Sequence, residues 1–507
     1  MRLATAALLL CATTSGAQPT RFAAAYDDVD RAFREYVARA HVPGAAWGVV
    51  VDGRLAHVGV AGFRDLAAKA PVDTNTVFRI ASMTKSFTAM SILKLRDEGK
   101  LALDDPAERW VPELRGLKYP TTDSPKITIR HLLSHSAGFP EDNPWGDQQL
   151  SLPDTAMSRM LRAGIPFSNA PGVAYEYSNW AFMILGRVVT AASGVPYRDY
   201  VQANILRPLG MTSSTLSPTA VPASRLAQGY RWEDEQWKLE PQLPDGAGGS
   251  MGGMLTSLHD LGAYVGMLLD AWPPRDGPET FPVRRASLRE MQQMARPGGL
   301  APRRTVSGAT ALAYSGYGFG LGVSATCDFA HIVAHSGGLP GFGSVMRWLP
   351  EYGVGVIAFG NLTYTSWGGP ADEALAALAK TGALERREPK PSAALAARRE
   401  AVSRLVLGWN DRLADSVAAV NLFLDRSRDR RRAEIASLLQ QVGPCRAGSG
   451  FESVENALRG RWLLPCDKGA LRVAITLAPT TPPTVQYLDV SAVPPGGEAP
   501  RRNLCGP

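Results

Sequence analysis

The sequence has little cysteine, little lysine and, beyond its first residues, no long apolar run. Five cysteines among 507 residues, with no C-x2-C pair, are too few for a disulfide scaffold and too scattered for a zinc site. Only 10 of the 54 basic residues are lysine, and no basic run is interleaved with aromatics. A net charge of +7 therefore gives little reason to expect a nucleic-acid partner. The sequence also predicts no stable membrane span.

The N-terminus has the pattern of a secretory signal peptide. Arg2 precedes the apolar run Leu3–Thr13, which is too short to cross a bilayer. The small residues Ser15, Gly16 and Ala17 follow this run, and cleavage is expected after Ala17. The alternative is a buried N-terminal helix. Cleavage after Ala17 predicts a periplasmic or secreted protein and leaves four cysteines, Cys327, Cys445, Cys466 and Cys505.

Strand patterns at both ends of the first 380 residues predict one large unit. A helix at 27–40 is followed by a hairpin around Asp52-Gly53. Residues 105–312 alternate short helices with loops, and four strand patterns return between 317 and 359. This order indicates an α+β domain whose sheet is closed by its own termini. A charged, proline-containing segment at 383–403 predicts a linker. Residues 404–507 predict a second unit, helical to 440 and then stranded.

Ser82 and Lys85 form an S-x-x-K pattern at the start of a predicted helix over 82–99. Residues three apart share a helix face, so the lysine amine can reach the serine hydroxyl and accept its proton. The alternative for Ser82 is a helix N-cap. Ser91 and Lys94 repeat the pattern in mid-helix, where no free N–H groups exist, and are interpreted as structural.

Tyr177-Ser178-Asn179 is the only Y-x-N in the chain. In an extended segment, residues i and i+2 point the same way, so Tyr177 and Asn179 can enter one cavity. A phenol near an ammonium can be held as phenolate and act as a base, and the asparagine can hold both the lysine and a substrate amide. The alternative is a structural loop tyrosine.

A third motif has three candidates. Lys380-Thr381-Gly382 is a literal K-T-G, but it follows a helical run and Gly382 is typical of a helix C-cap. His335-Ser336-Gly337 follows an apolar strand and precedes a glycine-rich segment that lets substrate approach the backbone. It is the better candidate, since His57-Val58-Gly59 lies in the N-terminal hairpin.

Taken together, the chain from 27 to 378 resembles the class C-like branch of the serine β-lactamase/penicillin-binding-protein superfamily, which includes esterases and D-amino-acid peptidases. The resemblance lies in five segments that occur in order: residues 78–89 around Ser82, His131–Gly138, Tyr177–Asn179, Pro208–Met211 and His335–Gly343. It implies an antiparallel sheet flanked by helices plus a helical domain, an α/β sandwich, followed by a small α+β accessory domain.

The resemblance also implies the roles of the residues. Ser82 attacks a carbonyl and becomes acylated, and Lys85 and Tyr177 transfer protons in an order that stays open. Asn179, His335, Ser336 and Gly337 line the substrate site. The backbone N–H groups of Ser82 and Gly338 form the oxyanion hole. No cofactor and no metal is implied.

His335 stands where true β-lactamases have lysine. Because histidine is mostly neutral at pH 7, the third motif lacks the permanent charge that suits the carboxylate of penicillins. We therefore expect a serine hydrolase acting on an ester or amide of a small molecule or peptide, similar to esterases or D-amino-acid peptidases, with at most weak β-lactamase activity. The alternatives are a penicillin-binding or sensor module, a class C-type β-lactamase and a DD-peptidase.

Competing sites are less favoured by their context. Ser250 lies in a G-x-S-x-G, but a proline- and glycine-rich loop precedes it instead of the strand that a hydrolase elbow needs. The pairs His131/His135 and His331/His335 lack acidic partners at metal-ligand spacing and are interpreted as structural. Cys445 and Cys466 bracket a short segment of the tail and are the expected disulfide, although four cysteines allow three connectivities. Cys327 and Cys505 are expected either to be free or to join the two units.

Overall fold

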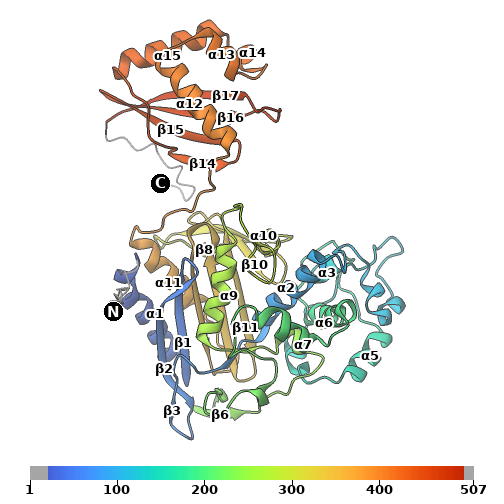
Figure 1. The fold of residues 1–507 in the computed structure, drawn as a ribbon. Coiled ribbons are helices and arrows are strands. Elements are labelled where there is room, and N and C mark those ends of the chain that lie inside the picture. Colours follow the sequence, from blue (N-terminus) through green and yellow to red (C-terminus); the bar gives the residue numbers. More distant parts are fainter. Residues whose placement is uncertain (1–20, 496–507) are drawn as a thin grey trace, which may run out of the picture.

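Nine antiparallel strands form the central sheet in the computed structural model, which describes residues 21–495 (Figure 1). The expected signal peptide and Cys505 lie outside these residues. The spatial order is β3-β2-β1-β13-β12-β11-β10-β9-β8. The strands are β1 (Gly44–Val51), β2 (Arg54–Asp65), β3 (Ala70–Pro71), β8 (Arg296–Arg304), β9 (Thr310–Tyr317), β10 (Gly322–Ala325), β11 (Ile332–Leu339), β12 (Phe342–Leu349) and β13 (Val354–Gly360).

The first strand pairs with the last strand of the domain. Ala45 of β1 lies opposite Gly360 of β13, and the register continues to Val51 opposite Val354. The sequence prediction of a sheet closed by its own termini is thus confirmed. The first of the four late strand patterns, residues 317–325, predicts one strand, which is wrong: a turn after Tyr317 divides it between β9 and β10.

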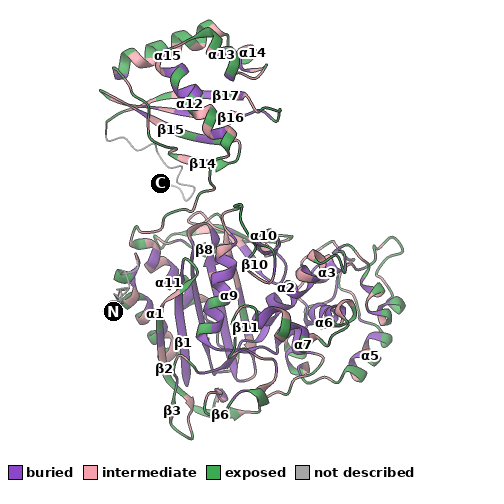
Figure 2. Cartoon of the chain, viewed as in Figure 1, coloured by how far each residue is buried: buried purple, intermediate pink, exposed green. Residues whose placement is uncertain are grey.

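Alternate residues of the buried strands enter two separate cores. Trp47 and Val49 of β1 pack with α1 (Tyr26–Arg39) and α11 (Gly368–Lys380), whereas Ala46 and Val50 face the opposite side. That opposite side is covered by α9 (Leu258–Asp270), as Figures 1 and 2 show. The alternation follows from the two-residue period of a strand, so a sheet buried on both faces is apolar throughout.

A helical region lies beside the sheet and packs against it through the larger core. Its central helices, α2 (Thr84–Asp97) and α6 (Asn179–Ser193), contact each other and bury most of their residues. A mostly apolar helix such as α6 is expected in an interior. The other helices are α3 (Ile129–Leu133), α4 (Asn143–Gly146), α5 (Asp154–Ala163), α7 (Tyr197–Val201), α8 (Gly249–Gly252) and α10 (Arg285–Met291). Two further sheets have two strands each. In one, β4 (Phe78–Arg79) pairs with β7 (Leu255–Thr256), and in the other, β5 (Gly229–Glu233) pairs with β6 (Gln236–Glu240).

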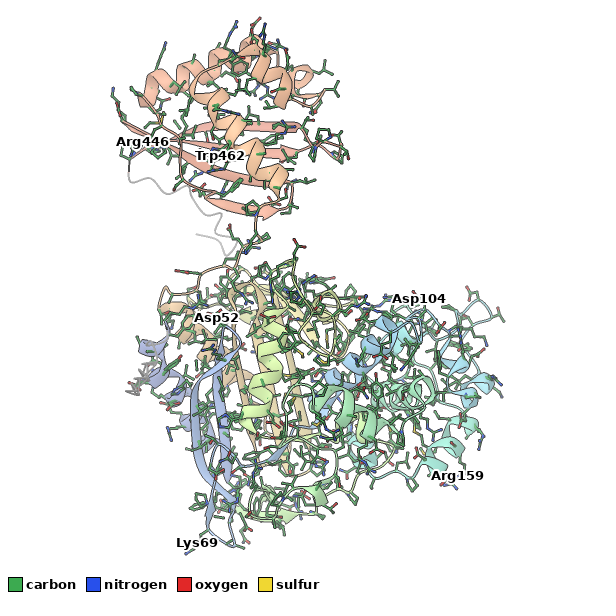
Figure 3. The ribbon with its side chains drawn as sticks, in the orientation of Figure 1. Asp52, Lys69, Asp104, Arg159, Arg446 and Trp462 are labelled. Carbon is green, nitrogen blue, oxygen red and sulfur yellow. A yellow bond between two sulfur atoms is a disulfide. The ribbon has the colours of Figure 1, made fainter. Side chains whose placement is uncertain are left out.

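The C-terminal unit is a four-stranded antiparallel sheet with helices on one side (Figure 1). Its elements are α12 (Ala393–Leu407), α13 (Asp411–Val417), α14 (Leu422–Asp425), α15 (Arg428–Val442), β14 (Ser453–Asn456), β15 (Arg459–Cys466), β16 (Gly469–Leu477) and β17 (Val485–Val493). Trp462 is fully buried between the helices and the sheet (Figure 3). This arrangement confirms the expected α+β character of the unit.

The expected linker at 383–403 is wrong over its second half. Helix α12 begins at Ala393, and its Leu395 and Val402 are fully buried in the C-terminal core. The alanine-rich composition of this helix concealed its apolar face, because alanine contributes little contrast to a hydrophobic pattern. Only residues 383–392 connect the two units without regular structure.

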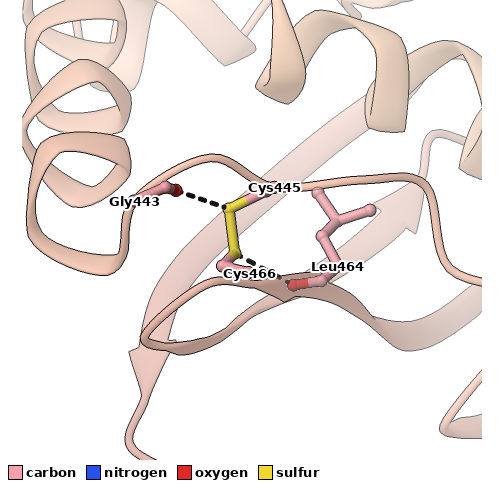
Figure 4. The surroundings of a disulfide bond; sticks show 4 residues. All are labelled: Gly443, Cys445, Leu464 and Cys466. Carbon is pink, nitrogen blue, oxygen red and sulfur yellow. Dashed lines mark hydrogen bonds between the residues drawn. A yellow bond between two sulfur atoms is a disulfide. The ribbon is translucent and has the colours of Figure 1, made fainter.

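A disulfide joins Cys445 to Cys466, the pair selected from the sequence (Figure 4). It ties the segment after α15 to the end of β15 across 21 residues of sequence. Cys327 is a free thiol in the larger unit. In the described range, no helix has the length and apolarity needed to cross a bilayer.

Candidate active site

Ser82 lies on a single 3-10 turn, Ala81–Met83, directly before α2. Ala81 has a φ of 49°, a left-handed conformation that costs free energy for a residue with a side chain and is concentrated at functional sites. Ser82 is only 8% exposed and lines a cavity of about 660 Å³. The N-cap position of α2 is Met83, so Ser82 does not serve as the cap of this helix.

The Lys85 amine is fully buried and surrounded by three oxygen atoms. Its Nζ lies 3.0 Å from Ser82 Oγ, 2.7 Å from Asn179 Oδ1 and 2.9 Å from the Met251 carbonyl oxygen. The last two oxygens can only accept hydrogen bonds, whereas a hydroxyl can donate or accept. A neutral amine has two hydrogens and one lone pair. With its hydrogens on Asn179 and Met251, the lone pair faces the Ser82 hydroxyl.

The charge state of Lys85 is set mainly by burial. Desolvation lowers the pKa of its amine to about 7, although the carboxylates of Asp147 and Asp142 oppose the shift. At neutral pH a large fraction of the amine is therefore uncharged, as a proton acceptor must be. Asp142 also caps α6, because it accepts hydrogen bonds from the backbone N–H groups of Asn179 and Trp180 at 2.6 and 3.0 Å.

Tyr177 borders the same two groups. Its ring centroid lies 4.8 Å from Lys85 Nζ, and its hydroxyl is hydrogen-bonded to Ser82. Burial raises the pKa of the phenol well above its ordinary value. The resting side chain is therefore a neutral phenol, in contrast to the phenolate considered from the sequence. Asn179 also departs from the expected extended segment, since it is the first residue of α6.

His335 lies on β11 with both ring nitrogens occupied. Nδ1 lies 2.6 Å from the Ser336 carbonyl oxygen, which can only accept, so the ring proton is on Nδ1. Nε2 then accepts from the Tyr317 hydroxyl at 2.8 Å. Burial, with the nearby Lys85, lowers the pKa of His335 to about 3. The imidazole is neutral, and in this arrangement it has no N–H left for a substrate.

Glycines bring β11 against the nucleophile segment. A Cβ on Gly337 would lie 2.2 Å from the Ile80 carbonyl oxygen and 3.0 Å from Ala81 Cβ, so only glycine permits this approach. Strand β10 pairs with β11 only as far as Ala334. The following segment of β11, which contains Gly338, therefore has a free edge beside the cavity, where backbone N–H groups can serve an oxyanion.

The cavity is lined by both halves of the large unit. The helical side contributes Asn143, Asp147, Tyr175 and Tyr177, and the sheet side contributes Tyr317, His335, Ser336, Gly338 and Arg347. The sequence did not predict four of the cavity residues: Asp147, Tyr175, Tyr317 and the loop residue Tyr364. None of them lies in one of the recognised motifs, and each reaches the cavity from a separate element.

The competing candidates do not provide a second catalytic group, although His135 packs against Tyr177. Ser250 is buried in α8 and donates to the Phe182 carbonyl oxygen at 2.9 Å, with no preceding strand. Lys380 ends α11 and Gly382 follows in the left-handed conformation, as expected for a helix terminus. His131 accepts from the Thr128 backbone, and His135 packs among aromatic rings. No cluster of potential metal ligands occurs within residues 21–495.

A family model described as Beta-lactamase matches residues 29–381, well over half of the chain. The protein therefore belongs to the Beta-lactamase family. Esterase EstB of Burkholderia gladioli is 29% identical over 403 residues, which cover 72% of this chain and 98% of the esterase. Penicillin-binding protein 4* of Bacillus subtilis (strain 168) is 26% identical over 298 residues, or 56% of this chain and 60% of that protein.

Solved structures share the fold. The octameric penicillin-binding protein homologue from Pyrococcus abyssi covers 89% of this chain and 90% of its own, with a TM-score of 0.56 and 23% identity. A class C beta-lactamase covers 72% of this chain and 98% of its own, with a TM-score of 0.56 and 19% identity. The fold expected from the sequence is thereby confirmed.

Proposed function

We propose that the protein is a secreted serine hydrolase that cleaves an ester or amide through an acyl-enzyme on Ser82. The main support is the placement of Lys85 Nζ 3.0 Å from Ser82 Oγ, beside acceptors on Asn179 and Met251 that can take both hydrogens of the neutral amine. The similarity to an esterase over nearly its whole length supports this reaction class. Secretion is supported by the N-terminal sequence and by the Cys445–Cys466 disulfide.

In the acylation step, the Ser82 Oγ–H proton passes to Lys85 Nζ as Oγ bonds to the substrate carbonyl carbon. The carbonyl oxygen becomes an oxyanion, which the N–H groups of Ser82 and Gly338 would stabilise by ~2.7–4 kcal/mol per donor. The neutral Tyr177 phenol borders both the serine and the lysine and is suited to hand a proton to the leaving oxygen or nitrogen as its bond to carbon breaks. The proton on Lys85 then restores the phenol.

In the deacylation step, water attacks the acyl carbon and gives its proton to the same Lys85–Tyr177 unit. The bond between the acyl carbon and Ser82 Oγ breaks, the serine regains a proton, and a carboxylic acid leaves. The step needs no group beyond water and the residues described.

The neutral His335 favours uncharged or cationic acyl substrates over penicillins. A penicillin carboxylate would find no N–H on this ring, because Nδ1 is bonded to Ser336 O and Nε2 to Tyr317. We therefore place esterase, amidase or peptidase activity ahead of β-lactamase activity.

The test combines labelling and turnover. Purified protein should react with a fluorophosphonate at Ser82, located by peptide mass spectrometry, and should hydrolyse p-nitrophenyl esters faster than a chromogenic cephalosporin. Ser82→Ala should abolish both labelling and hydrolysis, while Ser250→Ala should retain labelling. Labelling that persists in Ser82→Ala would refute the proposal. A stable acyl-Ser82 adduct without turnover would indicate a sensor.

A further inference from the structure

A carboxylate that the proposed mechanism does not use lies in the wall of the catalytic cavity. Asp147 follows α4 on the helical side, is 4% exposed and lines the same cavity as Ser82. Its Oδ1 lies 3.5 Å from Asn179 Nδ2, at the outer limit of a hydrogen bond. Asp142, by contrast, has short hydrogen bonds from the N-terminus of α6. Asp147 therefore has no counterpart to the two backbone hydrogen bonds of Asp142 in the described part of the chain.

Asp147 forms no ion pair with the described charged side chains around the cavity, although Lys85 acts on its charge through space. Of the residues lining the cavity in the described chain, Asp147 and Arg347 have side chains that are charged at neutral pH. Arg347 forms an ion pair with Asp372 of α11. His335 is neutral, and the three neighbours of Lys85 Nζ do not include Asp147. Among the described residues, Asp147 is thus a cavity carboxylate that no cation contacts directly.

Tyr364 places this charge close to the reacting atoms. It lines the cavity from the sheet side, and a Cβ on Gly338 would lie 2.8 Å from its Cδ1 atom. Its phenol interacts with the Asp147 carboxylate from across the cavity. Asp147 and Tyr364 therefore face each other beside the backbone assigned to the oxyanion hole, where the acyl part of a substrate would lie.

We infer that Asp147 is a specificity-determining residue that selects acyl groups carrying a positive charge, such as an ammonium, near the scissile carbonyl and that disfavours carboxylates. A hydrogen bond or ion pair to a buried carboxylate is about twice as strong as a neutral one. The low exposure of Asp147 limits screening by water and salt. This inference depends on the proposed acyl-enzyme function of Ser82.

The test uses two p-nitrophenyl esters of nearly identical shape, those of N,N,N-trimethylglycine and 3,3-dimethylbutyric acid, which differ by one positive charge. The measured quantity is the ratio of kcat/KM for the cationic ester to that for the neutral ester. Comparing variants cancels the different intrinsic reactivities of the esters. Assays at about pH 8.5 keep Lys85, whose pKa is about 7, neutral in every variant.

Asp147→Asn should lower this ratio about tenfold, equivalent to about 1.4 kcal/mol. Asp147→Glu should retain a ratio above that of Asp147→Asn. The control Asp154→Asn, which removes a carboxylate that is 83% exposed on α5, should leave the ratio unchanged. An equal loss on both esters in Asp147→Asn would overturn the inference, because it would assign Asp147 to the support of Lys85 and Asn179.

A measurement on the wild-type protein avoids any folding defect of the variants. N,N,N-Trimethylglycinamide should inhibit hydrolysis of the neutral ester at a lower concentration than 3,3-dimethylbutanamide does. Equal inhibition constants would contradict the inference. Failure of the proposed function is distinguishable, because Ser82→Ala would then hydrolyse both esters as fast as the wild type.

Discussion

The Tyr317 hydroxyl donates at 2.8 Å to His335 Nε2, the acceptor nitrogen of the Nδ1–H tautomer that the Ser336 carbonyl oxygen fixes. This hydrogen bond gives the third motif its chemistry in this protein. A lysine would present a cation to the cavity, whereas this histidine presents a neutral ring whose polar atoms are already bonded to the protein.

We predict that His335 does not titrate between pH 5 and 8, since burial and Lys85 lower its pKa to about 3. Its ring nitrogen shifts in a 15N-histidine NMR spectrum should therefore stay constant over this range. Tyr317→Phe should leave a buried acceptor unsatisfied and lower the free energy of unfolding by ~1–3 kcal/mol in denaturant titrations. A wild-type His335 resonance that titrates near pH 6.5 would contradict the assignment.

Activity on a neutral ester should rise with pH through the pKa of Lys85, about 7. Below this pH the amine is protonated and has no lone pair for the Ser82 proton; above it the amine is free to accept. A profile of kcat/KM from about pH 5 to 9 should show this acidic limb. Asp147→Asn removes a carboxylate that favours the ammonium form, so its limb should move to lower pH. A flat profile would exclude Lys85 as the acceptor.

Lys85→Met should lower kcat by at least about 10³-fold, because a serine hydroxyl without its base is a poor nucleophile. The matched control is the second S-x-x-K on the same helix. Ser91 Oγ donates to the Phe87 carbonyl oxygen inside α2, so Ser91→Ala and Lys94→Met should keep most of the activity. The activities of the variants are compared as initial rates of hydrolysis of one p-nitrophenyl ester. If Ser91→Ala or Lys94→Met lost as much activity as Lys85→Met, the S-x-x-K pattern would have a folding role only.

Gly337→Ala should impair both stability and activity. Its Cβ would meet the Ile80 carbonyl oxygen at 2.2 Å and push β11 away from the Ser82 segment. Overpacking of this kind costs ~1–3 kcal/mol, and we expect kcat to fall at least about tenfold, since small displacements of positioned groups are costly. Gly369→Ala is the control, as its Cβ would have no neighbour within 4 Å. Equal behaviour of the two variants would contradict the close packing at Gly337.

Removing the disulfide by a Cys445→Ser/Cys466→Ser double substitution should destabilise the C-terminal unit alone. Closing a loop of this length, with a sequence separation of 21, stabilises a fold by about 3 kcal/mol. Scanning calorimetry should show one transition moving to lower temperature, while ester hydrolysis at moderate temperature stays unchanged. Loss of activity together with that transition would show that the catalytic unit depends on the C-terminal one.

The order of the chemical groups and the outline of the fold could be predicted from the sequence. Ser82 and Lys85 are three residues apart, and a helix brings such residues together whatever surrounds them. The strand patterns at both ends of the domain likewise required partners, and β1 and β13 provide them for each other. Most of the alanine-rich helix α12 was not predicted, because its buried face differs little in hydrophobicity from its exposed face.

The protonation states of Lys85 and His335 and the charge of the cavity depend on tertiary contacts. The pKa of Lys85 depends on complete burial and on two carboxylates that lie far away in sequence, those of Asp142 and Asp147. The neutral state of His335 depends on its burial and on the nearby Lys85. The charge of the cavity depends on Asp147 and on the ion pair of Arg347 with Asp372. Electrostatic interactions act through space and vary with desolvation, so the spacing of residues along the chain does not encode them.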